Sequence, residues 1–181
     1  MALLRLPLLI LLLGVAAIIV LALAAPSRAA AASCPAVQAS VAQVSPTVIG
    51  GSVLCLVNAE RSAHGLGRLR QSGRLRLAAT RYSREMVAKS FFDHVSPSGS
   101  TLSSRVRVAG YRGRTLGENI GWGTGSLATP VEIVRAWMAS PPHRAVILNG
   151  RYREAGVGVA AGSPLGAPGT GATFVLDVGK R

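Results

Sequence analysis

The stretch "EAGVGVAAGSPLGAPGTGATFVLDVG", residues 154–179, decides the fold class. Its two ends, residues 154–162 and 172–179, have the composition of strands, and the Gly-, Pro- and Ala-rich centre suits an exposed hairpin tip. Upstream of it the chain carries helix signals, interrupted by a Gly-rich stretch at residues 117–126 that we expect to be irregular. Helices early and strands late predict an α+β sandwich.

Five segments before the hairpin carry helix signals, and they are residues 52–65, 72–94, 100–110, 129–140 and 140–150. In the first, Ser52 is the expected N-cap and Gly65 the terminating residue. The second repeats apolar residues at helical spacing and is expected to end near Phe92. In the fourth, Thr129 is the expected N-cap and Glu132 completes a capping box.

The N-terminus reads as an export signal, with Arg5 as the positive n-region, an apolar stretch over residues 6–25 and small residues at 29–32. The apolar stretch is also long enough to span a bilayer, so a retained membrane anchor is the alternative to cleavage. We therefore expect a secreted or envelope-associated protein. Its expected parts are a signal peptide or membrane anchor (1–32), a linker (33–49) and a folded domain (50–181).

The chain has two cysteines, Cys34 and Cys55. In an exported chain, a pair close in sequence indicates a disulfide, which would tie the segment after the leader to the first helix. The alternative is that Cys34 is the lipid acceptor of a bacterial lipoprotein, although the preceding "AAS" lacks the larger aliphatic residue expected there. A cysteine-based metal site is not expected from two thiols.

The charge is strongly basic, with 20 Lys and Arg against 7 Asp and Glu. Without Arg5 and Arg28 of the leader, 18 basic residues remain against 7 acidic ones, a net charge of +11. Such a field favours anionic partners, namely wall polymers or lipid headgroups, and export argues against nucleic acid. The basic residues are scattered along helical segments, so a solvated basic face is the alternative to a dedicated binding patch.

Few residues are available for chemistry. The sequence contains no G-x-S-x-G, S-x-x-K, H-E-x-x-H or P-loop motif, and it has three histidines and seven acids. His94 stands at the expected end of the second helix, Glu118 lies in "GEN", and His143 follows two prolines. They are far apart in sequence, so only the fold can bring them together. Taken singly, each is more often structural than catalytic.

Five motifs occur in the order of a known family: "LVNAERSAHGLGRLR", "FFDHVSPSG", "GENIGWG", "AWMASPPHRAVILNGRYREAGVGVA" and "TFVLDVG". The chain resembles the bacterial, SCP-like branch of the CAP superfamily, which comprises cysteine-rich secretory proteins, antigen 5 and pathogenesis-related 1 proteins. The resemblance covers residues 52–179. It implies a three-layer α-β-α sandwich with a central antiparallel sheet and an open cleft.

The resemblance also implies that His94 faces the cleft, that Glu118 joins it and that His143 lies near. Two histidines and a carboxylate match a zinc set with one open position, so these residues are candidates for catalysis or for a weak zinc or magnesium site. Eukaryotic members carry a second glutamate and a second histidine where this chain has Ser140 and Gly171. Less negative charge is then available to hold a divalent cation.

We expect a binding module that holds an anionic or amphipathic envelope ligand, such as a lipid, a wall polymer or a divalent cation. The alternative is a hydrolase in which His94 or Glu118 activates water, with or without a metal. A third reading is a purely structural envelope protein. An uncleaved leader would add a membrane contact, and a monomer is the default expectation for the oligomeric state. Asn58 and Arg61 are expected to hold neighbouring loops, and Trp122 and Trp137 to lie in the core.

Overall fold

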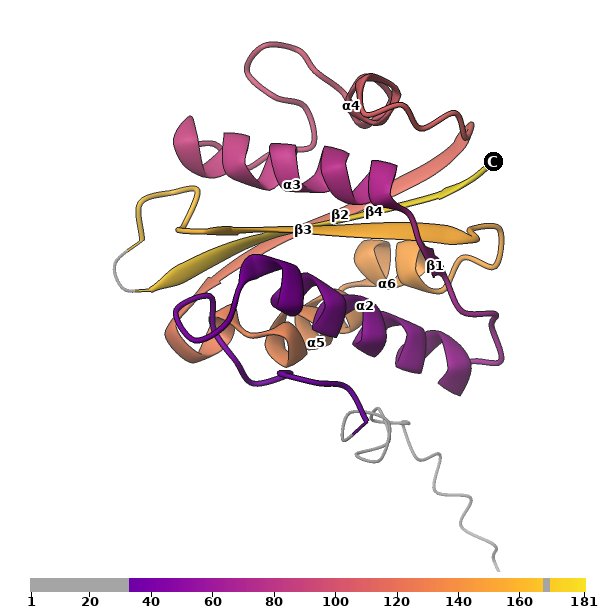
Figure 1. Ribbon diagram of the computed structural model, residues 1–181, viewed down its shortest axis with the longest axis horizontal. Helices are drawn as coiled ribbons and strands as arrows, with labels where there is room; N and C mark the ends of the chain where they lie inside the picture. The colour runs from indigo at the N-terminus through magenta and orange to yellow at the C-terminus, as the bar shows by residue number, and fades with distance from the viewer. Residues whose placement is uncertain (1–32, 168–169) are drawn as a thin grey trace, which may run out of the picture.

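A computed structural model describes residues 33–167 and 170–181, so the expected leader lies outside the described residues. The fold has three layers, with a central sheet between two layers of helices (Figure 1). In chain order the elements are α2 (Pro46–Ala63), β1 (Arg70–Gln71), α3 (Gly73–Ala88), α4 (Leu102–Val108), β2 (Thr115–Thr124), the 3-10 helix η1 (Gly125–Ala128), α5 (Pro130–Ala139), α6 (Pro141–Ile147), β3 (Glu154–Ala161) and β4 (Gly171–Lys180).

The sheet has the strand order β1-β3-β4-β2. The predicted hairpin is confirmed, because β3 and β4 pair antiparallel with Val157 opposite Leu176. On its other side β4 pairs antiparallel with β2, which is an edge strand of the described sheet. The two-residue β1 runs parallel to β3 and is the one exception to the antiparallel pattern among the described strands.

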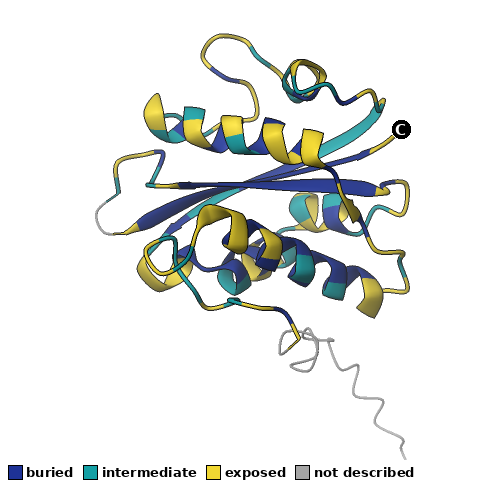
Figure 2. Cartoon of the chain, viewed as in Figure 1, coloured by how far each residue is buried: buried dark blue, intermediate teal, exposed yellow. Residues whose placement is uncertain are grey.

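Helices cover both faces of the sheet. On one face α2 and α5 bring Val53 and Trp137 into a core cluster with Leu176 of β4. On the other face α3 buries Met86 against Val175 of the same strand. Figure 2 shows the consequence: the central strands are buried, and the helices expose only their outer sides. The predicted α-β-α sandwich is therefore confirmed.

Glycines on β3 allow α3 to lie directly on the sheet. A Cβ atom added to Gly156 would lie 2.0 Å from the backbone nitrogen of Arg76, and one added to Gly158 would lie 2.1 Å from the carbonyl carbon of Ala79. Backbone therefore packs on backbone at these two positions, which no side chain larger than hydrogen permits.

The Gly-rich stretch at residues 117–126 is not irregular as expected, because most of it forms β2. The glycines there make room for large side chains from the neighbouring layer. A Cβ on Gly117 would lie 2.4 Å from the hydroxyl of Tyr152, and one on Gly121 would lie 3.0 Å from Nε1 of Trp137. Pairing with β4 over the whole strand outweighs the low strand propensity of glycine.

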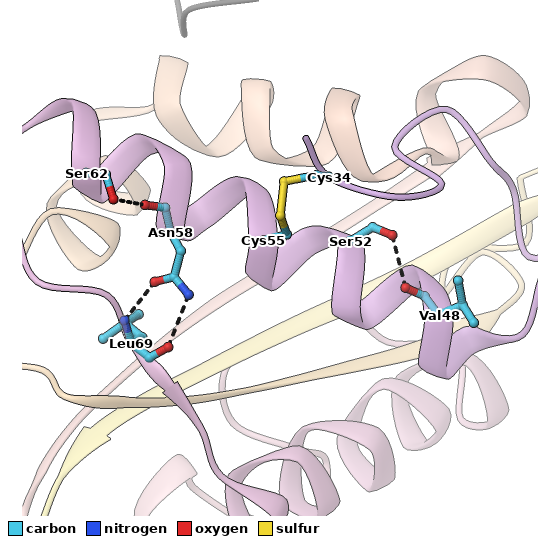
Figure 3. Close-up of a disulfide and its surroundings, with 7 residues drawn as sticks. All are labelled: Cys34, Val48, Ser52, Cys55, Asn58, Ser62 and Leu69. Carbon is cyan, nitrogen blue, oxygen red and sulfur yellow. Dashed lines mark hydrogen bonds between the residues drawn. A yellow bond between two sulfur atoms is a disulfide. The ribbon is translucent and has the colours of Figure 1, made fainter. Parts of the chain in front are cut away.

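The first helix begins earlier than predicted. Its N-cap is Ser45, whose hydroxyl accepts a hydrogen bond from the amide of Val48, so the prediction of Ser52 as N-cap is wrong. Ser52 lies inside α2, and its hydroxyl donates to the carbonyl of Val48 over 3.0 Å (Figure 3). The domain boundary expected at residue 50 therefore falls within α2.

Cys34 and Cys55 form the expected disulfide, which joins the segment before α2 to the middle of that helix (Figure 3). The expected linker also packs against the main core through side chains that include those of Val37, Val41 and Val44. A disulfide-bonded Cys34 has no thiol available for lipid attachment.

Two other helix ends differ from the predictions. Helix α3 ends at Ala88, before Phe92, because Ser90 adopts a positive φ of 51° that breaks the helix. At the start of α5, the prediction of a capping box is wrong. The hydroxyl of Thr129 donates to the carbonyl of Ser126 instead of capping the helix, and the Glu132 carboxylate pairs with Arg135.

Candidate functional site

His94 and Glu118 come together at the β2 edge of the sheet. The imidazole Nδ1 of His94 lies 2.9 Å from Oε1 of Glu118. The His94 side chain is 53% exposed and that of Glu118 only 3%, so the ring stands in solvent with the carboxylate behind it. The hydrogen bond with Glu118 raises the pKa of His94 above its ordinary value, against the opposing effect of partial burial.

The turn that presents His94 is fixed from α3. The hydroxyl of Tyr82, on the buried side of that helix, donates to the carbonyl of Asp93 over 2.5 Å. The amide of Phe91 donates to the carbonyl of Met86, which closes the end of the helix. These two bonds fix the backbone before and after Phe92. They therefore determine the position of the His94 backbone, from which the imidazole extends.

Arg105 of α4 is a site residue that the sequence interpretation missed. The terminal nitrogen Nη2 donates to Oε2 of Glu118 over 2.6 Å, and Nη1 donates to the carbonyls of His94 and Ser100. The guanidinium carbon also lies 3.3 Å from the ring centroid of Tyr82, a cation–π contact. Arg105 therefore connects the carboxylate, the His94 turn and α3.

Asp177 is a second missed residue. It lies opposite Glu118 in the register of β4 with β2, and it is fully buried. Neither carboxyl oxygen accepts a hydrogen bond from a donor within the described residues. Burial, followed by the negative charge of Glu118, raises the pKa of the Asp177 carboxyl well above its usual range, which favours the protonated form. A protonated Asp177 can donate to Glu118.

His143 reaches the same edge from the other face of the sheet. Asn119, next to Glu118 on β2, donates from Nδ2 to the carbonyl of His143 over 3.0 Å. The Nδ1 atom of His143 lies 2.8 Å from the hydroxyl of Ser140 at the start of α6. Burial and, next, the positive charge of His94 lower the pKa of His143.

The residues present do not fit a divalent cation. Within the part of the chain that the structure describes, no group of three or more His, Cys, Asp or Glu side chains could hold a metal ion. Both oxygens of Glu118 are engaged, by His94 and by the guanidinium of Arg105. Ligation through Glu118 would require a cation to displace another cation from a buried ion pair.

The supporting residues behave largely as expected. The side-chain amide of Asn58 exchanges two hydrogen bonds with the backbone of Leu69 (Figure 3), and the buried Arg61 donates to the carbonyls of Gly67, Ile147 and Asn149, residues that lie in loops or at a helix end. Trp137 is buried, and its indole donates to the carbonyl of Ile120. Trp122 is only half-buried, so the expectation that it lies in the core is wrong.

The α-β-α sandwich is the architecture that the sequence resemblance implied, and the structure joins His94 to Glu118. The family model described as "CAP: Cysteine-rich secretory protein family" matches residues 54–177, and the chain belongs to this family. The resemblance to its bacterial, SCP-like members is confirmed by the relatives and structures that follow.

Two relatives come from Bacillus subtilis. The "uncharacterized protein YkwD" is 40% identical over 112 residues, which are 61% of this chain and 42% of that protein. The "uncharacterized membrane protein YlbC" is 32% identical over 107 residues, 59% of this chain and 30% of that protein. The chain thus matches less than half the length of either relative.

Solved structures share the fold at low sequence identity. An extracellular protein containing an SCP domain from Bacillus anthracis superposes with a TM-score of 0.62 at 23% identity, over 76% of this chain and 44% of that one. An outer surface protein from Borrelia burgdorferi gives 0.57 at 20% identity, over 71% of this chain and 90% of that one.

Within the described residues of this chain, no helix has both the length and the apolar character needed to cross a membrane.

Proposed function

We propose that this CAP domain is a binding module of the cell envelope, which takes an anionic group of a lipid or wall polymer at the exposed ring of His94. The apolar leader supports an envelope location. Similar proteins described as extracellular, outer-surface or membrane proteins support it as well.

The observation that carries the proposal is the double engagement of Glu118. One carboxylate oxygen meets His94 and the other meets Arg105, while the neighbouring Asp177 favours its neutral form. With His94 protonated, the cluster carries two positive charges and one negative charge. The excess positive charge lies on the exposed ring, whose Nε2 has no hydrogen-bond partner within the described residues. An N–H donor that carries charge favours an anionic acceptor.

The test is the pH dependence of binding to phosphatidylglycerol vesicles and to a glycerol phosphate polymer, with phosphatidylcholine vesicles as the neutral reference. Binding should weaken as pH rises through the pKa of His94, because the ring then loses its charge. His94→Gln should remove this pH-dependent part. His64→Gln is the matched control, because His64 is exposed and lies at the end of α2. Identical pH profiles for wild type and His94→Gln would contradict the proposal.

The hydrolase alternative has one specific observation in its favour. The pKa of His94 is raised while that of His143 is lowered, and such pairs often divide acid and base roles. The sequence led us to expect His94 or Glu118 as the group that activates water, whereas these pKa directions favour His143 in that role. Neutral His143 would take a proton from water as the water attacks a carbonyl carbon, and protonated His94 would give one to the leaving group. A peptide library and isolated cell wall are the substrates to assay. Turnover that is absent, or unchanged in His143→Gln, removes this alternative.

A further inference from the structure

A second polar hollow lies where α4 meets the start of β2. It has a volume of about 130 Å³, and the residues that line it include Ser103, Arg107, Tyr111, Arg112, Arg114 and Leu116. None of these residues hydrogen-bonds to the side chain of His94 or Glu118 within the described part of the chain. The residues that line the hollow are therefore different from those that form the site described above.

The three arginines of this hollow have no acidic partner. All seven acids of the chain lie in the described part, and the ion pairs found there join Glu85, Glu118, Glu132 and Glu154 to other basic groups. Arg107, Arg112 and Arg114 are exposed, and no ion pair of the described residues includes them. Three arginines that have no ion pair within the described residues thus line one small space.

The acid that hydrogen-bonds to the lining, Glu154, is already paired with a basic residue. Glu154 accepts a hydrogen bond from the hydroxyl of Tyr111, the aromatic residue of the hollow, over 2.8 Å. The same carboxylate accepts from Arg181 through both of its oxygens. Hydrogen bonding from Arg181 is the main cause that lowers the pKa of Glu154. With its carboxylate paired in this way, Glu154 offsets little of the positive charge around the hollow.

The floor of the hollow is closely packed. Val106 and Tyr111 are almost fully buried, and the amide of Tyr111 donates to the carbonyl of Val106 over 2.8 Å. A Cβ atom added to Gly113 would lie 2.4 Å from the ring of Tyr111 and 2.5 Å from the carbonyl of Lys180. The backbone that carries Arg112 and Arg114 is therefore held against the ring of Tyr111 and the end of β4.

We propose that this arginine hollow binds a phosphate group. Its volume of about 130 Å³ leaves room for a tetrahedral oxyanion of five heavy atoms. Guanidinium groups match phosphate with paired N–H donors, and the exposed hydroxyl of Ser103 supplies a neutral donor. The phosphate can belong to a lipid headgroup or to a phosphate polymer of the envelope.

The experiment compares two triple variants of equal charge. One is Arg107→Gln/Arg112→Gln/Arg114→Gln. The control is Arg68→Gln/Arg76→Gln/Arg84→Gln, which removes three other exposed arginines that have no ion pair within the described residues. The dissociation constant of inorganic phosphate is measured by amide chemical shifts, with chloride at equal ionic strength as the reference. Both variants should keep the unfolding midpoint of the wild type, because all six side chains are exposed.

The expected result is a rise in the dissociation constant of at least about tenfold in the first variant and little change in the control. Amide shifts should centre on Gly113. Equal losses in both variants, or shifts spread over all arginine-bearing segments, would overturn the proposal. The dissociation constant is taken from the amide shift of Gly113 in the hollow, so its result is distinguishable from the pH-dependent binding that is tested at His94.

Two further arms identify the source of the phosphate. Wild type and both variants are tested on the glycerol phosphate polymer and on phosphatidylglycerol vesicles. Retention that depends on the three arginines of the hollow for one of these materials supports the proposal and assigns that source. Retention that depends on them for neither material overturns the proposal.

Discussion

Glu118 and Asp177 lie directly opposite each other on β2 and β4, with both carboxyl groups on the same face of the sheet. One is bonded to two cationic side chains, and the other is fully buried without a donor among the described residues. Two adjacent carboxyl groups do not ionise together easily, so the neutral form of Asp177 leaves Glu118 as the negative charge that holds His94 and Arg105.

This arrangement predicts the effect of Asp177→Asn on stability. The folded pKa of Asp177 is raised, so the unfolded chain releases this proton above about pH 4 while the folded chain retains it. Wild-type stability therefore falls as pH rises toward the folded pKa, by up to ~1.4 kcal/mol per pH unit for one proton. The free energy of unfolding of Asp177→Asn, relative to wild type, should increase from pH 4 to pH 7 in urea titrations.

Asp93→Asn is the control for this experiment, because Asp93 is exposed and its side chain accepts only a local amide bond from Val95 among the described residues. A difference between Asp177→Asn and wild type that stays constant with pH, or shrinks as pH rises, would mean that Asp177 is ionised in the folded protein.

Arg105→Lys tests how the His94 turn is held. A lysine ammonium can replace one contact of the guanidinium but not the bonds to Glu118, His94 and Ser100 together. We expect a loss of about 2 kcal/mol in the free energy of unfolding. Arg107→Lys, at an exposed position of the same helix, should change it by no more than about 0.5 kcal/mol. Equal effects of the two substitutions would show that Arg105 does not fix the turn.

Gly158→Ala tests the contact between α3 and β3. The new methyl group would meet the helix backbone at 2.1 Å, so the layers must separate, at a cost of about 1–3 kcal/mol or more. Gly51→Ala, inside α2 with open space around its Cβ position, should instead stabilise the protein by about 0.5–1 kcal/mol. Thermal unfolding of both variants measures the difference, and a neutral Gly158→Ala would contradict the close packing.

The sequence predicted the elements that have strong local signals. The β3–β4 hairpin and the helices were found because apolar spacing and turn residues mark them. Strand β2 was missed, because its glycines weaken the local strand signal. Pairing with β4 makes this segment a strand, and the side chains of Tyr152 and Trp137 occupy the space that the glycines leave. The start of α2 was misplaced because Ser52 resembles a cap but serves inside the helix.

The candidate site was predicted only in part. His94 and Glu118 were recognised from family motifs, and the structure joins them directly. Arg105 gave no signal, because it is one arginine among many in a basic chain. Asp177 lies in an apolar strand, where its burial and its position opposite Glu118 depend on strand register, which no local pattern of the chain encodes.

Glu118 holds His94 as a protonated ring, and a pH titration of the three imidazoles by NMR in the intact domain tests this most directly. We predict that His94 titrates above the ordinary histidine value of about 6.5 and His143 below it, and that Glu118→Gln brings the pKa of His94 down. A pKa of His94 at or below the ordinary value, or one unchanged in Glu118→Gln, would contradict the account.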